Sequence, residues 1–401
     1  GAKRGDTPVG ATGARGVLRR PTLAGITPIE IAKSDATGDK RCMLPHLRSS
    51  VMIARSVKPE MQSHLHIDPP HTRTEQINPE EIFSLVRTEL ALVEKEFDRE
   101  VSNASEVVAA IGSYLREGGG KRVRPALLLL ASKLVSGEAG PSAIRMATVM
   151  EMLHTATLVH DDIIDDARVR RGRASVNAKW GNDVTVLLGD WLYMTAFDKT
   201  LRERSFEILD VLTSMTRLMT EGEIIQLTLV GNSRITEAEH LDILRRKTGY
   251  MFSACAEVGA IVAGATREQQ RALARYGLSV GIAFQLIDDV LDFVSTEDKL
   301  GKPVANDLRE GKLTLPLIYL LAETGDAHRD IVETVVRERG FESVARDAVL
   351  QLLFDHGTLE RARREAERYA EEAIEALSIF GDSKYRRALL GVPRFILDRD
   401  M

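Results

Sequence analysis

Apolar residues recur at intervals of three and four along most of the chain, starting near Pro79. The spacing is clear in IFSLVRTELALVEKEF and MATVMEMLHTATLVH, and it places the apolar side chains of each segment on one face of a helix. Alternation at intervals of two, which indicates strands, is scarce. The pattern therefore predicts an all-α domain over residues 79–401.

Two segments near the C-terminus carry more specific expectations. Residues 359–380 are expected to form an amphipathic helix with one apolar stripe, made of Ala362, Ala366, Tyr369, Ala373 and Leu377. The stripe is expected to pack in the core, and a partner surface is the alternative. Residues 306–316, NDLREGKLTLP, mix both charges and are expected to form a loop.

Residues 1–78 lack the helical spacing and are rich in Gly, Pro, Thr and Arg. Such a segment buries too little apolar surface to fold, so we expect a largely disordered N-terminal extension. Its scattered acidic residues argue against a transit peptide. It is expected to be a flexible tail, or sequence upstream of a start at Met43, Met52 or Met61.

Composition fits a helical domain with a large aliphatic core, since 44% of the 401 residues are hydrophobic and only 5% are aromatic. The net charge of -5 gives no basic excess for nucleic-acid binding. Two cysteines, Cys42 and Cys255, make no disulfide framework and indicate a reducing compartment. There is no apolar run of roughly 18 residues and no signal peptide, so a cytoplasmic protein without a membrane span is expected.

Two aspartate clusters of the same form, DDIID and DDVLD, follow apolar helical stretches. Their members are Asp161, Asp162, Asp165, Asp288, Asp289 and Asp292. The first and last aspartate of each cluster are about 400° apart around a helix, so they share one face. A single acidic pair is usually a solvated surface feature. Here the preceding segments, LHTATLVH and GIAFQLI, contain no Lys or Arg, which places the carboxylates at the ends of buried helices.

Six carboxylates facing one cleft would repel one another unless cations lay between them. Hard oxygen ligands suit Mg²⁺, which keeps coordination positions open for substrate phosphates. The clusters therefore predict a site that binds a phosphorylated substrate through metal.

Cationic motifs supply the other half of such a site. In GGGKRVRP the glycines let the backbone approach an anion, and Lys121, Arg122 and Arg124 offer charge before a proline opens a helix. A basic surface turn is the alternative, and the spacing differs from that of a nucleotide-binding loop. Arg170 and Arg171 follow the first aspartate cluster and suit either phosphate recognition or ion pairing.

Taken together and in order, these motifs resemble those of the all-trans polyprenyl diphosphate synthases, the medium- and long-chain type of isoprenyl diphosphate synthase. The resemblance covers roughly residue 79 to the C-terminus and rests on GGGKRVRP, HTATLVHDDIIDDARVRRG, GDWL, KTG, FQLIDDVLDF and GKPVANDLREGKLTLP. It implies an antiparallel bundle of long helices around a central cleft, and a homodimer. Ala305 departs from the family pattern, which commonly has glycine there, and this concerns the flexibility of that loop.

The resemblance implies a transferase that condenses isopentenyl diphosphate with an allylic diphosphate and releases diphosphate. The six aspartates would hold about three Mg²⁺, with Mn²⁺ as a substitute, on the allylic diphosphate. That substrate would also contact Arg170, Lys247, Thr248, Gln285 and Lys302. Isopentenyl diphosphate would contact Lys121, Arg124, His154 and Arg171. The oxygens of Thr248 and Gln285 would stabilise the allylic cation, and the released diphosphate is a candidate proton acceptor.

Two histidines precede the first aspartate cluster. His154 lies seven residues before Asp161, so both point to nearly the same helix face. A lone histidine in an apolar helix is more often a core residue, but the resemblance assigns His154 to the substrate. His160 has no such assignment and is expected to be structural.

Product length is also implied by the resemblance. In the family, aromatic residues four and five positions before the first aspartate close the pocket for the growing chain. Thr157 and Ala156 are small here, and Leu153 is not aromatic, which implies an open path and a product longer than about twenty carbons. Candidates for a deeper floor, with ordinary core packing as the alternative, are Tyr193, Met194 and Phe197.

Two other functions share part of this pattern. A terpene cyclase has an aspartate-rich motif and a helical fold, but it needs neither GGGKRVRP nor a second DDxxD. A non-catalytic prenyltransferase subunit would be expected to lack aspartates or arginines that this chain retains. The exact product length, the primer and the downstream pathway do not follow from the sequence.

Overall fold

The computed structural model describes residues 79–170, 172–295 and 304–398, all of which belong to one compact unit, Thr72–Met401. The predicted extension, residues 1–78, lies outside the described residues. The first elements are α1 (Pro79–Ser84), α2 (Arg87–Ser102), α3 (Glu106–Glu117), α4 (Val123–Ser136), α5 (Pro141–Ile164), β1 (Val169–Arg170), β2 (Arg173–Ala174), α6 (Val176–Trp180), α7 (Asn182–Leu201) and α8 (Phe206–Leu229). They are followed by α9 (Glu237–Leu244), the π-helix η2 (Arg245–Gly249), α10 (Tyr250–Val262), α11 (Arg267–Val294), α13 (Asn306–Arg309), α14 (Leu315–Thr324), the 3-10 helix η3 (Gly325–Ala327), α15 (Arg329–Glu338), α16 (Arg346–Asp355), α17 (Thr358–Ala376) and α18 (Lys384–Leu397).

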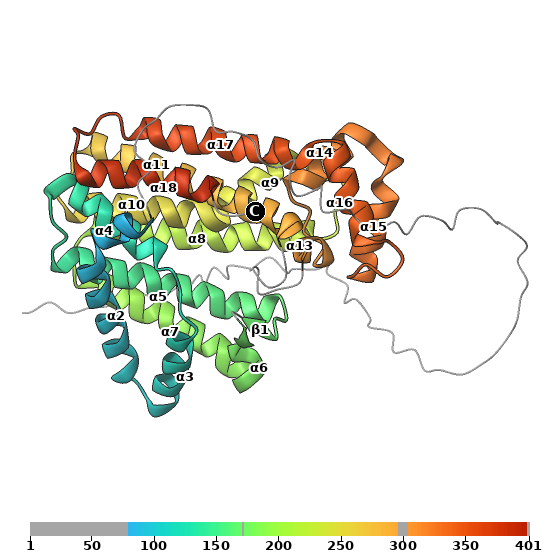
Figure 1. Cartoon of the computed structure of the whole chain (residues 1–401). Coiled ribbons are helices and arrows are strands. Elements are labelled where there is room, and N and C mark those ends of the chain that lie inside the picture. Colours follow the sequence, from blue (N-terminus) through green and yellow to red (C-terminus); the bar gives the residue numbers. More distant parts are fainter. Residues whose placement is uncertain (1–78, 171, 296–303, 399–401) are drawn as a thin grey trace, which may run out of the picture. The chain divides into compact units, whose positions relative to one another are not determined.

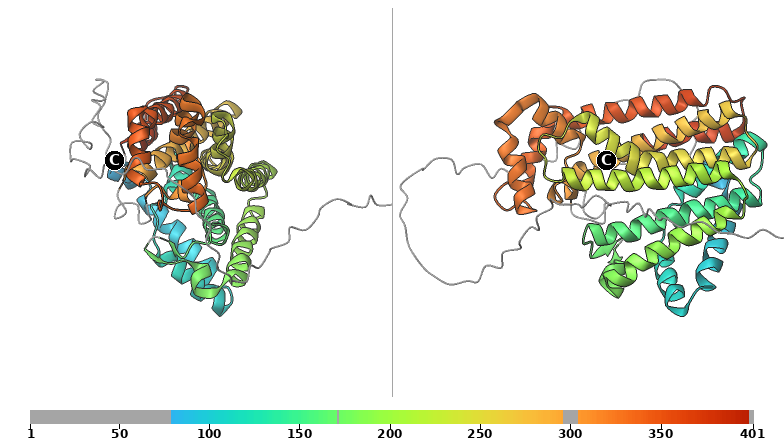
Figure 2. Two further views of the ribbon diagram at one scale, coloured as in Figure 1. Left: turned by 90° about the vertical axis from the view of Figure 1, so that its right-hand side faces the viewer. Right: turned by 180° about the vertical axis from the view of Figure 1, so that it is seen from behind.

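The all-α prediction is confirmed. Long helices lie side by side and form a bundle, with α10 and α11 at its centre (Figures 1 and 2). Helix α11 packs against α10 and α17, α10 packs against α4 and α8, and α5 packs against α7, α4 and α2. None of the helices in the described part of the chain combines the length and the apolar character that crossing a membrane requires.

Glycines let the central helices approach closely. A Cβ atom on Gly259 of α10 would lie 2.4 Å from the backbone oxygen of Leu128 on α4. A Cβ atom on Gly277 of α11 would lie 2.4 Å from the backbone oxygen of Phe252 on α10. Helix α4 is buried without interruption from Pro125 to Ser132, as expected for a helix that is apolar on all sides. These contacts build the core that holds the ends of α5 and α11 in place.

Two N-terminal signals in the sequence explain where site-bearing helices begin. Thr236 accepts a hydrogen bond from the amide of Glu239, and the Glu239 side chain accepts one in return, which starts α9 with a capping box. Thr266 and Gln269 form the same arrangement at the start of α11. Each box satisfies backbone donors that the first helical turn leaves unpaired.

The structure confirms one helix prediction near the C-terminus and corrects three other expectations. The predicted amphipathic helix, residues 359–380, is α17, which ends earlier, at Ala376. Every residue of the predicted apolar stripe is buried in the core, including Leu377 directly after the helix. Residues 306–316 are not a plain loop, because they contain α13 and the first two residues of α14. Helix α4 begins at Val123 rather than at Pro125, since proline is tolerated throughout the first turn, where the backbone N–H has no helical partner. The pair β1 and β2 was not predicted because two-residue strands are too short to show alternation.

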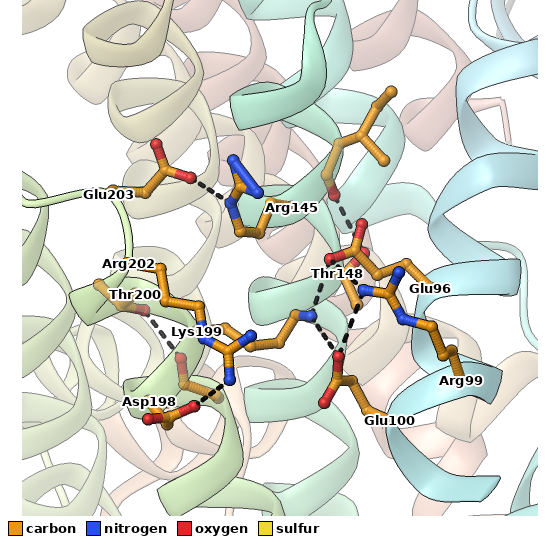
Figure 3. A network of polar contacts seen from close by, with 12 residues as sticks. Glu96, Arg99, Glu100, Arg145, Thr148, Asp198, Lys199, Thr200, Arg202 and Glu203 are labelled. Carbon is orange, nitrogen blue, oxygen red and sulfur yellow. Dashed lines mark hydrogen bonds and ion pairs between the residues drawn. The ribbon is translucent and has the colours of Figure 1, made fainter. Parts of the chain in front are cut away.

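A buried lysine joins two of the outer helices (Figure 3). Lys199 of α7 is 1% exposed, and its Nζ lies 2.7 Å from Glu96 Oε1 and 2.8 Å from Glu100 Oε1, both on α2. Burial by itself raises the pKa of Glu100, but hydrogen bonding and charge from Lys199 and Arg99 together outweigh burial and hold that pKa below its usual value. A buried ammonium requires such partners because an unpaired charge in the interior is costly. The ion pairs therefore fix α2 against α7.

Candidate active site

The two aspartate clusters lie at the C-terminal ends of two long helices. Asp161 and Asp162 are in the last turn of α5, and Asp165 caps that end. The second cluster lies in the last two turns of α11. The C-terminal end of a helix carries partial negative charge, so carboxylates there are unfavourable unless a cation offsets them. The arrangement favours a cation-binding site at both helix ends.

The segment that follows α11 contacts both clusters. Lys312 Nζ lies 2.9 Å from Asp165 Oδ1 and 2.7 Å from Glu310 Oε2. The backbone amide of Asp307 donates a hydrogen bond to Asp292 Oδ2 over 3.1 Å. One short segment, residues 307–312, thus contacts both Asp165 and Asp292, so the two clusters belong to one site.

The six aspartates differ in their exposure. Three of them are only 1–3% exposed and have contacts with the protein, namely Asp162, Asp289 and Asp292. The half-buried aspartates are Asp161, Asp165 and Asp288. Asp162 pairs with Arg170 on β1, and burial still raises the pKa of Asp162 despite that partner. The half-buried group is the better placed to meet a cation from solution.

Asp161 is a carboxylate of the first cluster whose surroundings disfavour its negative charge. Burial raises its pKa to about 6. The charge of Lys247 opposes this rise, whereas Glu223 and Asp165 add to it. A carboxylate with a raised pKa in the company of other carboxylates is typical of a site that binds cations or protons in function.

The donor set fits Mg²⁺ bound together with a phosphorylated substrate. In the described part of the chain, no three His, Cys, Asp or Glu side chains converge as a complete protein metal site. Mg²⁺ does not need one, because it commonly takes one or two carboxylates and fills the other positions with water and substrate phosphates. Asp161, Asp165 and Asp288 offer such carboxylates at two helix ends.

Three residues predicted to contact the allylic substrate, Lys247, Thr248 and Gln285, come together beside the aspartates. The π-helix η2 carries Lys247 and Thr248. Lys247 Nζ lies 2.6 Å from Glu223 Oε2 and 2.7 Å from Gln226 Oε1, both on α8. The Thr248 hydroxyl donates to Gln285 Oε1 over 3.0 Å. Helices α8, η2 and α11 therefore assemble this part of the predicted site.

The glycine-rich motif forms a turn that an arginine closes. Arg122 has the left-handed backbone angles φ 49° and ψ 36°, which are unfavourable for a residue with a Cβ atom. Its guanidinium forms an ion pair with Glu94 of α2, and its Nη1 lies 2.8 Å from Glu151 Oε1 on α5. The two carboxylates hold Arg122 in this conformation and so fix the turn that precedes α4.

The predicted site for isopentenyl diphosphate is brought together in part. Arg124 Nη1 lies 3.1 Å from His154 Nε2, and the Arg124 guanidinium lies 4.9 Å from the centre of the Phe252 ring. Lys121 is exposed in the turn before α4.

A cavity of about 80 Å³ lies between the glycine-rich turn, α3, α5 and the β1–β2 pair. Its lining includes Gly118, Gly119, His154, Asp162 and Arg170.

Arg171 and Lys302, two predicted diphosphate contacts, lie outside the described residues. His160 contacts α7, where its ring lies 5.8 Å from that of Tyr193 and its Nε2 lies 3.2 Å from the backbone oxygen of Val186. These contacts agree with the structural role expected for His160.

The residues predicted to set product length lie along α5. Leu153 and Ala156 are fully buried, and the half-buried Thr157 donates its hydroxyl to the backbone oxygen of His154 over 2.7 Å. On α7, the expectation that Met194 lies inside the bundle is wrong, because its side chain is 64% exposed. The other two floor candidates, Tyr193 and Phe197, are half-buried. Adjacent residues of a helix point about 100° apart, so Tyr193 and Met194 cannot share one face.

Sequence reasoning missed several residues that the fold brings to the site. Lys312 lay in a predicted loop with no assigned role, although its charge marked it as a candidate. Burial alone lowers the pKa of Lys312, but Asp165 and Glu310 outweigh burial and raise it, so the ammonium is retained beside the first cluster. His240 contacts Asp289 through a 3.2 Å distance from Nε2 to Oδ2. Nothing in the local pattern around His240 pointed to that contact.

Comparison with known proteins adds to this geometry. Residues 105–352 match the family described as Polyprenyl synthetase. The chain is 36% identical over 321 residues to the octaprenyl diphosphate synthase of Haemophilus influenzae. The aligned region covers 80% of this chain and 97% of that protein. It is also 36% identical over 320 residues to the all-trans-nonaprenyl-diphosphate synthase (geranyl-diphosphate specific) of Rhodobacter capsulatus, covering 80% of this chain and 98% of that protein.

The fold is likewise similar to that of a solved structure. A polyprenyl synthase from Caulobacter crescentus, crystallised with calcium and isoprenyl diphosphate, superposes with a TM-score of 0.76 at 32% sequence identity. The similarity covers 81% of this chain and 99% of that one. It therefore extends over nearly all the helices that carry the aspartates and the cationic residues.

Proposed function

Given that the chain belongs to the polyprenyl synthetase family, we propose that it condenses isopentenyl diphosphate with an allylic diphosphate, giving a polyprenyl diphosphate longer than C20. It is a prenyl transferase, and residues 79–401 are its proposed catalytic domain. The observation that carries the proposal is the convergence of two aspartate clusters at the ends of α5 and α11, with Lys247, Arg170 and Lys312 beside them.

The first chemical task is to break the bond between the allylic carbon and the diphosphate oxygen. This bond breaks heterolytically only if the negative charge that develops on the diphosphate is stabilised. Mg²⁺, when bound, would supply part of the positive charge that stabilises it. We propose that the six aspartates together form the metal site, with Asp161, Asp165 and Asp288 as the direct ligands because those three are half-buried. The three buried aspartates would support the site through their contacts with neighbouring groups of the protein.

Cationic side chains would complete each diphosphate pocket. Contacts to the allylic diphosphate are proposed for Arg170, Lys247, Lys302 and Lys312. Lys312 already lies beside Asp165, so its ammonium is near the position that a metal-bound diphosphate would take. Contacts to isopentenyl diphosphate are proposed for Lys121, Arg124, His154 and Arg171, of which Arg124 and His154 are 3.1 Å apart.

The second task is carbon–carbon bond formation. The allylic cation is delocalised, and oxygens of Thr248 and Gln285 would face it and stabilise it. The double bond of isopentenyl diphosphate then attacks the cation, and loss of a proton gives a chain longer by one five-carbon unit. The released diphosphate is the proposed proton acceptor. No nucleophilic side chain is required.

Two observations bear on the proposed product length, the small side chains before Asp161 and the names of the relatives. Ala156 and Thr157 are small, so neither closes a path for the tail in the way an aromatic ring would. The similar proteins are named for eight and nine prenyl units. Both observations support a product longer than C20.

We also propose that the enzyme is a homodimer in the cytoplasm. Exposed apolar side chains, including Leu187 and Met194 on α7 and Ile224 on α8, support a partner surface along these two helices. The low cysteine content, with Cys255 buried and free, supports a reducing compartment.

The decisive experiment is an assay with radiolabelled isopentenyl diphosphate and farnesyl diphosphate, with products resolved by chain length. We expect labelled products longer than C20 with Mg²⁺ or Mn²⁺, and none in excess EDTA. Asp161→Ala and Asp288→Ala should each lower kcat by at least about a hundredfold. Asp347→Ala, at an exposed position on α16, is the matched control and should retain activity. Undiminished turnover in EDTA, or a cyclic hydrocarbon as the product, would refute the proposal.

A further inference from the structure

A chain of hydrogen bonds runs through four side chains beside the proposed reacting carbons. The Thr248 hydroxyl of η2 donates to Gln285 Oε1 of α11 over 3.0 Å. Gln285 Nε2 donates to Asp289 Oδ1, one turn further along α11, over 3.0 Å. Asp289 Oδ2 lies 3.2 Å from Nε2 of His240 on α9. Three elements, η2, α11 and α9, therefore meet in one polar chain.

This series of hydrogen bonds fixes the orientation of the Gln285 side-chain amide. A hydroxyl can donate or accept, so Thr248 tolerates either orientation of the amide. An ionised carboxylate only accepts, so Asp289 tolerates only the orientation with the Gln285 NH₂ group toward it. The amide oxygen then lies on the side of Thr248. Rotating the amide would set its oxygen against the carboxylate and present N–H groups in place of the oxygen.

His240 fixes Asp289 in turn. The two side chains are 6% and 4% exposed, so water has little access to either. A carboxylate that accepts at Oδ2 requires a donor, which sets His240 in the tautomer with its proton on Nε2. Both oxygens of Asp289 are thereby engaged by side chains. Asp288 precedes it on α11 and is half-buried, so the two neighbours differ in their surroundings.

We propose that Asp289 and His240 are positioning residues that hold the Gln285 amide with its oxygen toward the allylic cation. The inference rests on the proposed function, in which Gln285 and Thr248 face that cation. An amide oxygen stabilises a neighbouring positive charge, whereas the amide N–H groups destabilise it, so the orientation decides the sign of the effect. In this assignment Asp288 binds metal and Asp289 orients the amide.

The experiment replaces Asp289 and His240, with Asp288 for comparison, and measures catalysis and metal binding separately. Asp289→Asn keeps the shape but can donate, so the Gln285 amide loses its fixed orientation. We expect kcat to fall by about tenfold to a hundredfold, with both KM values within about threefold of wild type. Binding of Mn²⁺ with inorganic pyrophosphate, followed by electron paramagnetic resonance, should be unchanged. Asp288→Asn should instead weaken Mn²⁺ binding by about tenfold or more.

Substitutions of His240 separate positioning from general destabilisation. His240→Gln retains a side-chain donor and is expected to keep most of kcat. His240→Leu removes the donor and should lower kcat by about tenfold without weakening Mn²⁺ binding. Thermal unfolding of each variant shows whether the fold is retained.

The outcomes are distinct. The positioning role is overturned if Asp289→Asn weakens Mn²⁺ binding as much as Asp288→Asn does, or if it leaves kcat unchanged. It is also overturned if His240→Gln and His240→Leu lose the same activity. If the wild-type protein makes no polyprenyl product, the proposed function itself is wrong. The wild-type assay shows this before any variant is compared.

Discussion

At the scale of single residues, Asp161 links pH to the stability of the metal-free protein. Its pKa is raised from 3.8 to about 6, so between these values the folded chain holds a proton that the unfolded chain has lost. Stability contributed by this group is therefore present at low pH and is lost as pH rises through about 6.

Asp161→Asn removes that titration. In EDTA, we expect the free energy of unfolding of the variant, relative to wild type, to rise by roughly 1–2 kcal/mol between pH 4.5 and pH 7.5. This is below the full linkage value because the side chain is half-buried and solvent screens part of the charge. Chemical denaturation at both pH values measures it. A difference that does not change with pH would contradict the raised pKa.

Ala156 is the residue at which product length is most open to test. It lies five positions before Asp161 on α5 and is fully buried. If the growing chain passes this position, as proposed, a large ring there would obstruct it. We expect Ala156→Phe to shorten the main product to about fifteen or twenty carbons while the first condensations continue, because overfilling costs roughly 1–3 kcal/mol or excludes the tail. Chromatography of the labelled products tests this.

The unfolding temperature of the same variant serves as its control. A folded Ala156→Phe protein with the wild-type product distribution would show that length is set elsewhere, with Tyr193 and Phe197 as the next candidates.

Among the elements, the strained turn at Arg122 is expected to affect the binding of one substrate and not the other. Glu94 and Glu151 hold this turn, which orients Lys121 and the first turn of α4. Arg122→Ala should raise KM for isopentenyl diphosphate by about tenfold with little change in KM for the allylic substrate, because lost positioning acts on the nearer pocket.

Arg202→Ala is the matched control for that variant. Arg202 pairs with Asp198 at the surface, at the C-terminal end of α7. Equal effects of Arg122→Ala on both substrates would count against a local role of the turn.

The contact between α2 and α7 depends on Lys199. Lys199→Met leaves Glu96 and Glu100 without their buried cation. We expect a loss of about 3 kcal/mol in the free energy of unfolding, at the lower end for a broken buried ion pair because both carboxylates keep some exposure. Urea denaturation at neutral pH measures it. Lys384→Met, at an exposed position on α18, should change stability by less than about 0.5 kcal/mol.

At the scale of the whole molecule, the exposed apolar side chains of α7 and α8 are the main feature still unpartnered within the described chain. Leu187, Met194 and Ile224 are 57–67% exposed, and both helices lie at the surface in the view from behind (Figure 2). We expect a dimer in light scattering, and Met194→Asp should shift it toward monomer, because a buried unpaired charge is costly at an interface. A monomeric wild type would contradict the proposed homodimer.

The fold was largely predictable because helical periodicity is local. The aspartate clusters were predictable too, since their spacing is complete within five residues. The contacts that link elements were not predictable. Lys312 and Asp165 are 147 positions apart, and no local pattern joins them. The left-handed backbone of Arg122 was also hidden, because it depends on Glu94 and Glu151 from other helices.

The number of residues in the π-helix η2 determines how α9 is rotated relative to α10. It closes with a hydrogen bond from the amide of Tyr250 to the oxygen of Arg245, five residues back, where an α-helix would reach only four. Deleting one residue between α9 and α10 would let them merge into one regular helix, but it would turn α9 by about 100° about their common axis. His240 would swing away from Asp289 even though every side chain of the site was retained. The site thus depends on the rotation of α9 about its axis as well as on the identity of its residues.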